Sequence, residues 1–501
     1  MHLIDPKGHT RRAFLQRSSA LAMAGTAMPF AVNLSAMSEA AAQTATDYKA
    51  LVCVFLFGGN DYANTVITYD DDSYGKYSTI RVPQASGGVA IPKDAALAAT
   101  LLSPTVPLPN ARQYALHPSM TELANLFNST GPTGGKVAVQ LNVGPLVVPL
   151  SRALYNNSNK KLYPQPPKLF SHNDQQSTWQ SSSPEGSTVG WGGNVGDLVL
   201  NRNSNSLFTC MSVSGNAVFL SGDSALQYQV STGGAVRINS VSPASGTTLY
   251  GSATVKSAMQ ALTQQTRAHK LENEYNRVTK RAVEAEGTIT TAIAQPYAAG
   301  TFPVPATNLG NQLAMVARLI RGRAATGAKR QVFMVSMGGF DLHDNLINNQ
   351  APLLKQVSDA MASFHAAMAA EGLGDKVTAF TASDFGRTLA SNGDGADHGW
   401  GNHHFVVGGA VKGKMIYGAP PVVSINNTST SADYEGHVGQ GRLIPTTSVD
   451  QYGATMGKWF GLNDAQLLDI LPNLKNFNGN TLVVNGVTYT YPRDAGFMKP
   501  A

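Results

Sequence analysis

Continuous apolar runs alternate with polar, glycine-rich loops along this chain, and the runs predict buried strands. The first run extends from Ala50 to Phe57 and stops at Gly58-Gly59. Further strands are predicted over 136–143, 331–337, 377–382 and 405–411, which are mainly apolar. An unbroken apolar run that ends in glycines is typical of a central strand covered on both faces.

Segments with helical periodicity lie between these strands. They cover 120–127, 252–294, 307–322 and 352–370. Residues 151–190 are polar and predict loops, residues 207–250 predict short strands, and 481–491 predict a hairpin turning at Asn485-Gly486. Strands that alternate with helices indicate an α/β fold with a parallel sheet.

Polar residues follow three of the predicted strands directly. Asp61 follows the first strand, Asp341 and His343 follow 331–337, and Asp384 follows 377–382. Because the carboxyl ends of parallel strands meet at one edge of a sheet, we expect all four side chains at that edge.

Length and composition indicate the size of the folded core, and the charge argues against nucleic acid as a partner. The chain has 501 residues, of which 43% are hydrophobic and 14% charged, enough for one large domain or two closely joined ones. The net charge is +6, but the first 42 residues hold four basic and two acidic side chains, which leaves +4. No basic stripe with interleaved aromatics is present, so nucleic-acid binding is not expected.

The N-terminus has the features of an export signal. Thr10-Arg11-Arg12-Ala13-Phe14-Leu15 resembles the twin-arginine motif, a weakly apolar run follows, and 40–42 are alanines suited to cleavage. We therefore expect a signal peptide over 1–42, a single domain over 43–501, the twin-arginine translocase as a partner, and a periplasmic or secreted location. Since such cargo crosses the membrane folded and often carries a metal, a metal site becomes more plausible. No later segment is apolar enough for a membrane helix.

The chain has two cysteines, Cys53 and Cys210. An oxidising destination permits a disulfide between them. Both lie in apolar, strand-like runs, so two buried thiols are the alternative. Two cysteines are too few for a four-cysteine zinc or iron–sulfur site.

Histidines gather in one segment of the chain. Three of the eleven, His398, His403 and His404, fall within seven positions just after Asp397. Imidazoles and carboxylates on flexible glycine-rich loops are the usual ligands of a divalent metal. Asp341 and His343, two residues apart, can face one ion from an extended segment. The alternative is a polar loop whose histidines are satisfied by hydrogen bonds.

Four further residues are candidates for the chemistry. Arg387, at the predicted start of a helix, could hold an anionic group or form a salt bridge to Asp384. His172 is a candidate ligand or base, and Ser171 a candidate nucleophile, although both also suit a polar loop. Asp61 suits either a metal ligand or a helix cap.

These motifs together resemble one family. The motifs are the leader, Phe57–Thr65, Phe170–Gln180, Gly338–His343, Ser383–Thr388 and Asp397–His404. They are similar to the family catalogued as domain of unknown function 1501, over nearly the whole chain after the leader. That family is related in fold to the alkaline phosphatase and sulfatase superfamily. The resemblance implies a three-layer α/β sandwich with a largely parallel central sheet, a β-rich insertion near 200–250, and a long helical segment near 252–294.

The resemblance also implies ligands for one or two divalent metals, with zinc, manganese or calcium as the candidates. The ligands that it implies are Asp61, Asp341, His343, Asp384 and one or more of His398, His403 and His404. In the superfamily a histidine follows the aspartate that corresponds to Asp384, whereas Phe385 stands here.

The leading functional hypothesis is an exported metal-dependent hydrolase of phosphate or sulfate esters, acting on a small-molecule or glycan-linked substrate. One alternative is a non-catalytic cell-envelope protein that retains the fold and binds a glycan or a protein. A weaker alternative is an oxidoreductase, although no dinucleotide-binding glycine motif follows a strand.

Overall fold

A computed structural model describes residues 48–500 except 132–133, 243–245, 304–305, 432 and 485–486. The predicted signal peptide and the turn residues Asn485-Gly486 lie outside the described residues. The strands on either side of that turn are described, and they pair antiparallel as predicted.

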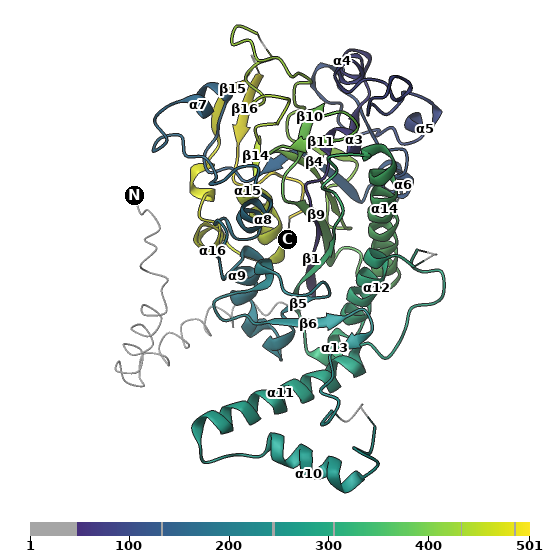
Figure 1. Ribbon diagram of the computed structural model, residues 1–501, viewed down its shortest axis with the longest axis vertical. Coiled ribbons are helices and arrows are strands. Elements are labelled where there is room, and N and C mark those ends of the chain that lie inside the picture. The colour runs from purple at the N-terminus through teal and green to yellow at the C-terminus, as the bar shows by residue number, and fades with distance from the viewer. Residues whose placement is uncertain are drawn as a thin grey trace. The chain divides into compact units, whose positions relative to one another are not determined.

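A mixed, mostly parallel sheet of ten strands forms the centre of the fold (Figure 1). Its strands are β1 (Lys49–Leu56), β4 (Val137–Gly144), β5 (Cys210–Ser212), β6 (Gln227–Ser231), β7 (Gly234–Ala235), β8 (Arg330–Met337), β9 (Val377–Ser383), β12 (Asn402–Val407), β13 (Met415–Tyr417) and β14 (Thr447–Ser448). Their order is β13-β4-β12-β9-β1-β8-β5-β6-β7, with β14 beside β4. Strand β1 pairs in parallel with β8 and β9, while β12 runs antiparallel to both of its neighbours.

Helices cover both faces of this sheet, which makes the fold a three-layer α/β sandwich. All eight residues of β1 are buried. Val52 and Val54 belong to the core under α6 (Thr121–Asn128), α12 (Asn308–Arg321) and α14 (Leu346–Ala370). Leu51, Cys53 and Phe55 belong to the core under α8 (His172–Ser181), α9 (Trp191–Asp197), α15 (Val449–Phe460) and α16 (Asp464–Ile470). Because alternate side chains of a strand point to opposite faces, a strand buried on both must be apolar throughout.

The remaining elements lie around this sandwich. The other helices are α3 (Tyr62–Thr65), α4 (Asp71–Arg81), α5 (Ala95–Ala98), α7 (Arg152–Asn156), α10 (Ala253–Gln264), α11 (Lys270–Ala292) and α13 (Arg323–Thr326). Three two-stranded sheets complete the fold: β2 (Val66–Thr68) with β3 (Tyr114–Leu116), β10 (Arg387–Ser391) with β11 (Ala396–His398), and β15 (Asn480–Val484) with β16 (Val487–Tyr491).

Several predicted elements need correction. The polar segment 151–190 contains helices α7 and α8. Six residues of α8 are buried, but all of them except Trp179 are polar, so α8 has no apolar stripe. The predicted long helix over 252–294 is two helices, interrupted between Gln264 and Lys270. The short strands expected over 207–250 are present and extend the edge of the central sheet beyond β8.

The two cysteines are free thiols. Both are fully buried in the same core, on the side of the sheet covered by α8 and α9. Burial raises the pKa of both thiols. Of the two sequence alternatives, buried thiols are therefore the one observed.

Candidate metal centre

Three neighbouring strands, β9, β1 and β8, end at the same edge of the sheet and deliver the polar residues predicted there. Asp384 directly follows β9, and Asp341 and His343 lie in the loop after β8. His398 ends β11 and pairs with Arg387 of β10. His172 is the first residue of α8 and reaches the same edge from a different part of the chain.

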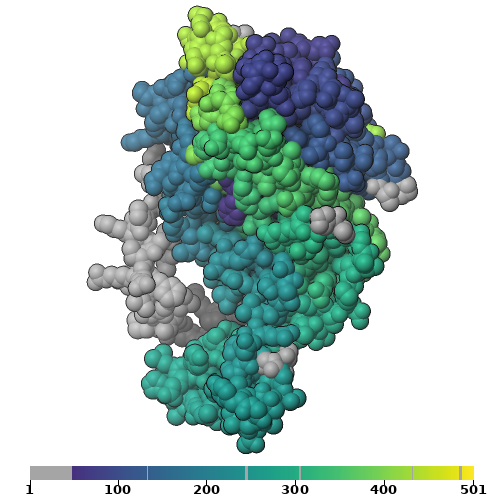
Figure 2. Space-filling view, turned by 45° about the vertical axis from the view of Figure 1, so that its right-hand side comes forward, coloured from purple at the N-terminus to yellow at the C-terminus, as the bar shows by residue number. Residues whose placement is uncertain are grey.

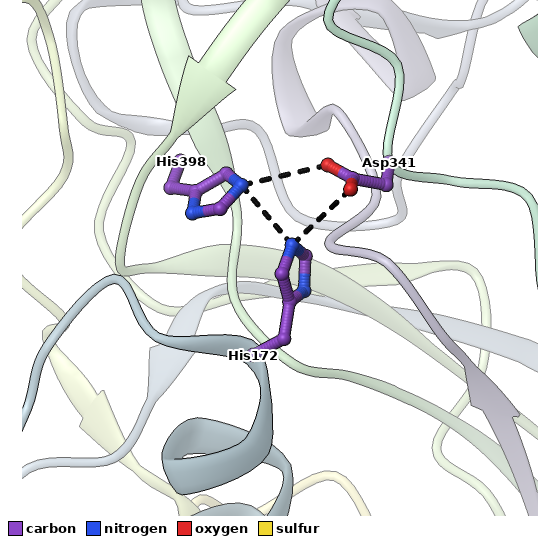
Figure 3. Close-up of side chains that lie close together, drawn as sticks. All are labelled: His172, Asp341 and His398. Carbon is purple, nitrogen blue, oxygen red and sulfur yellow. Dashed lines mark hydrogen bonds and ion pairs between the residues drawn. The ribbon is translucent and has the colours of Figure 1, made fainter.

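The Nε2 atoms of three histidines meet at this edge. His398 Nε2 lies 3.0 Å from His172 Nε2 and 2.9 Å from His343 Nε2. The Asp341 carboxylate faces the same point, with oxygens 3.4 Å from His172 Nε2, 3.1 Å from His343 Nε2 and 3.5 Å from His398 Nε2. Figure 3 shows His172, Asp341 and His398, the three residues whose donor atoms lie close enough together to share one ion.

The opposite nitrogen of each imidazole is held by an oxygen acceptor. His172 Nδ1 lies 2.7 Å from Asp384 Oδ2, and His398 Nδ1 lies 2.7 Å from the Phe170 carbonyl. His343 Nδ1 lies 3.3 Å from Asp397 Oδ1. An ionised carboxylate or a carbonyl can only accept a hydrogen bond, so each Nδ1 carries a proton and Nε2 is the nitrogen that can offer a lone pair. The Nε2 of His343 also lies 3.3 Å from Arg387 Nη1, which donates to it.

Lone pairs that face each other at about 3 Å repel unless a proton or a cation lies between them. The hydrogen bond to Asp384 raises the pKa of His172, whereas burial lowers the pKa of His398. Without a metal, a proton on His172 would therefore bridge these two rings. Metal-binding histidines usually donate their other N–H to a carboxylate or a carbonyl, which fixes the tautomer and the ring orientation. The residues present therefore fit a divalent metal.

Asp384 holds the His172 ring in position. Its side chain is fully buried, and Oδ2 also accepts hydrogen bonds from Gly58 N at 3.1 Å and Gln176 Nε2 at 2.8 Å. With His172 Nδ1 between them, Asp384 lies behind a candidate ligand instead of facing the meeting point of the Nε2 atoms. The predicted ligand Asp384 is thus placed as an outer partner that orients His172.

We expect Asp384→Asn to lower metal affinity by about 10–100-fold, the usual cost of losing an outer-shell partner. An amide can present its N–H to His172 Nδ1 and so favour the wrong tautomer. Isothermal titration with zinc measures the loss. Asp397→Asn is the matched comparison, and its effect should be smaller because Asp397 is partly exposed and its hydrogen bond to His343 is longer. Equal affinities for Asp384→Asn and the unaltered protein would contradict the assigned role.

The Phe385 ring packs against the imidazole rings of His172 and His398. Its ring centroid lies 4.8 Å from that of His172 and 4.8 Å from that of His398, and the side chain is buried. Gly59 makes room for it, because a Cβ at that glycine would lie 2.5 Å from the Phe385 ring. Phe385 thus supplies packing where the resemblance led us to expect a ligand, and His172 is the imidazole that accompanies Asp384.

Arg387 begins strand β10, so its predicted position at a helix N-terminus is wrong. Its side chain is buried, and its N–H groups bond to Asp341 and to the carbonyls of Gly58, Gly59 and Ala396. Although desolvation acts in the opposite direction, the hydrogen bond and charge of Arg387 lower the pKa of Asp341. Arg387 keeps Asp341 ionised and in place, and its salt bridge joins Asp341, not the predicted partner Asp384.

Asp61 follows β1 as predicted, but its carboxylate forms an ion pair with Arg81 and does not face the three histidines. Its oxygens lie 2.5 Å and 2.9 Å from the guanidinium nitrogens of Arg81, and both residues are buried. Oδ1 also caps helix α3 by accepting from Ala63 N at 2.9 Å. The structure therefore places Asp61 in a buried ion pair and a helix cap, the second of the two roles weighed from sequence.

His403 and His404 are buried on β12 and do not join the three imidazoles described above. His403 Nδ1 accepts from Asn142 N at 3.0 Å, and His404 Nδ1 lies 3.2 Å from Thr381 Oγ1. Burial lowers the pKa of each to about 3. Ser171 Oγ, the candidate nucleophile, donates to Asp174 Oδ2 at 2.9 Å.

The buried pair His403 and His404 makes folding stability depend on pH. Each is neutral in the folded state down to about pH 3 but titrates near 6.5 when unfolded, so stability is full above 6.5 and falls as pH decreases. We expect the free energy of unfolding to fall by roughly 2 kcal/mol for each histidine between pH 7 and 5. Urea denaturation at the two pH values measures this loss, with exposed His269→Gln as the control variant. A stability that is constant from pH 7 to 5 would contradict the prediction.

Two outer partners complete the cluster: Asp397 had been counted among the donors of the histidine-rich loop, whereas Gln176 had not been given a role from sequence. Asp397 precedes His398 and bonds to His343, and Gln176 lies one helical turn after His172 and bonds to Asp384. Both belong to motifs that had been noted, but only the fold shows which ring or carboxylate each one contacts.

Among the described residues, no helix combines the length and apolar character needed to cross a bilayer. Among curated proteins, no sequence matches this chain. The family model described as "Protein of unknown function (DUF1501)" matches residues 48–471, which span the whole candidate centre. The chain therefore belongs to the DUF1501 family.

Proposed function

We propose that the chain binds a divalent transition metal through His172, His398 and Asp341. His343 Nε2 lies 2.9 Å from His398 Nε2, and we propose that it becomes the fourth ligand by exchanging the hydrogen bond that it accepts from Arg387 for the metal. The observation that carries the proposal is the matched orientation of three imidazoles, each with Nδ1 held by an oxygen acceptor and Nε2 directed inward. A donor set of three imidazole nitrogens and one carboxylate oxygen favours zinc, and manganese is the second candidate. Calcium, one of the metals expected from the resemblance, prefers six to eight oxygen ligands and is disfavoured.

We further propose that this site hydrolyses phosphate or sulfate esters. Asp341 and His343 are 47% and 43% exposed, so the donors are reachable from solvent on one side. Structural metal sites are closed, whereas catalytic ones keep a position open to water or substrate. A divalent ion bound here would polarise an ester oxygen and lower the pKa of a water molecule. The choice of phosphate or sulfate esters rests on the resemblance to the phosphatase and sulfatase superfamily.

The chain's own residues hold and orient the donors. Asp384 fixes the tautomer of His172, Arg387 holds Asp341 ionised, and Phe385 excludes water from beneath the rings. Because Ser171 donates to Asp174, we assign no side-chain nucleophile and infer attack by water. The twin-arginine motif supports export, so we propose that this chemistry takes place in the periplasm or outside the cell.

Hydrolysis of p-nitrophenyl phosphate, bis-p-nitrophenyl phosphate and p-nitrophenyl sulfate by zinc- or manganese-loaded protein tests the catalytic part. We expect turnover of at least one ester, lost in His343→Ala and after chelation. His343 is partly exposed, so this variant should fold normally. Turnover that persists in the variant or in chelator would contradict the proposal.

A second function, binding without catalysis, is favoured by the state of Arg387. The bonds of its N–H groups to protein acceptors argue against its predicted grip on an anionic substrate group. A loaded protein that keeps its metal but hydrolyses none of the three esters would favour this cell-envelope binding role.

A further inference from the structure

Helices α10 and α11 form a hairpin that extends away from the central sheet (Figure 1). In the space-filling view of Figure 2 the hairpin is the teal lobe at the lower end. It lies apart from the candidate metal centre, and the proposed function does not use it.

The hairpin buries some of its polar side chains and exposes large apolar side chains on both helices. Lys256 is buried and donates to the Ser242 carbonyl at 3.1 Å, while Asn276 of α11 is buried and donates to the Leu262 carbonyl at 3.2 Å. The exposed apolar side chains are Val255, Met259 and Leu262 on α10, and Leu271, Tyr275 and Val278 on α11. An amphipathic helix normally buries its apolar stripe, so an exposed one on both helices indicates a missing partner.

The stripe on α11 has the spacing of a helix–helix seam. Its apolar positions alternate in steps of four and three: Leu271, Tyr275, Val278, Ala282, Ala285, Ile289 and Ala292. Ala285 and Ile289, in the second half of the helix, are buried in the main core, whereas Leu271 and Tyr275 are 77% and 67% exposed. One continuous heptad stripe is therefore packed against the core at one end and exposed at the other. A stripe with this spacing is typical of a surface that packs against another helix.

The charges beside this stripe identify the partner as a second copy of the same helix. Glu274 and Arg281 are seven residues apart, so they lie on the same flank of the stripe. On the other flank Thr279 is buried. Consider two copies of α11 that pair antiparallel about a two-fold axis. The flanks that carry Glu274 and Arg281 then lie side by side, and Glu274 of each copy lies near Arg281 of the other.

The apolar positions fit the same arrangement. With the two-fold axis between positions 276 and 277, Tyr275 lies opposite Val278, and the large Leu271 lies opposite the small Ala282.

We propose that the α10–α11 hairpin is a homodimerisation surface, in which α11 pairs antiparallel with α11 of a second copy. Sedimentation velocity on the full mature chain, from about 1 to 100 μM, tests this. We expect dimers whose dissociation constant rises at least about tenfold in Leu271→Glu. Leu162→Glu is the matched control, since Leu162 is also exposed (59%) but lies outside the hairpin; it should change nothing.

A charge exchange tests the pairing itself. Glu274→Arg and Arg281→Glu should each weaken the dimer, and the double variant should restore it. Glu274→Arg also removes the intrachain ion pair with Arg277, so restoration is the decisive result. A protein that stays monomeric throughout, or a dimer indifferent to Leu271→Glu and to the exchange, would overturn the proposal. So would a monomer that binds phosphatidylglycerol vesicles through Leu271, since that result would assign the stripe to a membrane surface.

Discussion

Replacement of His398 by alanine is expected to abolish stoichiometric metal binding. His398 Nε2 is the central donor of the cluster, since it lies within 3.0 Å of the corresponding nitrogens of both His172 and His343. Removing it takes away one ligand and the contact that brings the other two rings together. The loss should exceed the 10–100-fold that an outer-shell change costs. Titration with zinc, followed by elemental analysis after gel filtration, measures it.

The matched control is His269→Ala, which removes an exposed imidazole from the loop before α11. It should leave affinity and stoichiometry unchanged. His398 is partly buried, so the melting temperature of the metal-free His398→Ala protein must be measured beside that of the unaltered protein. A folded His398→Ala protein that still binds one metal ion with unaltered affinity would remove this histidine from the site.

Asp61→Ala is expected to destabilise the fold by about 3–5 kcal/mol and to leave metal binding intact. The change leaves the buried Arg81 guanidinium without the Asp61 carboxylate, which is the anion that it pairs with. Removing one partner of a buried ion pair costs far more than the pair itself contributes, because the remaining charge stays desolvated. Urea denaturation measures the stability loss, and zinc titration of the folded protein measures the metal stoichiometry.

Asp72→Ala is the comparison for Asp61→Ala. Asp72 also pairs with a cation, Lys76, but both side chains are exposed, so its loss should cost at most about 1 kcal/mol. If Asp61→Ala lost the metal while keeping its stability, the carboxylate would be a ligand, as the family resemblance implies, and its assignment here as a structural residue would be wrong.

The sheet could be predicted from sequence because its central strands are buried on both faces. That condition makes β1, β8 and β9 mainly apolar, and their parallel pairing brings their carboxyl ends to one edge. Helix α8 could not be predicted, since its sequence is polar and its buried face is polar apart from Trp179. His172 was a candidate from its residue type, but its contact with Asp384 could not be predicted, because the two residues lie more than 200 positions apart and no local pattern links them.

The histidines show where composition misleads. His398, His403 and His404 are close in sequence, but only His398 ends on the open edge. The other two lie within β12, which is buried throughout because it is an interior strand of the sheet. Similarly, the Asp61–Arg81 pair joins the end of β1 to the end of α4 across 20 residues, a contact that depends on the packing of α4. Residue type predicted the kind of site, whereas the position of each residue in its strand or helix decided which residues belong to it.

The most direct test of the metal centre is the metal content of the folded protein. We expect protein purified without added metal, stripped with chelator and then titrated with zinc or manganese, to take up one ion per chain with a gain in melting temperature. His172→Ala and His398→Ala should each lose both the uptake and the gain. Absence of any bound metal as purified, together with no uptake and no thermal shift on titration, would contradict the account.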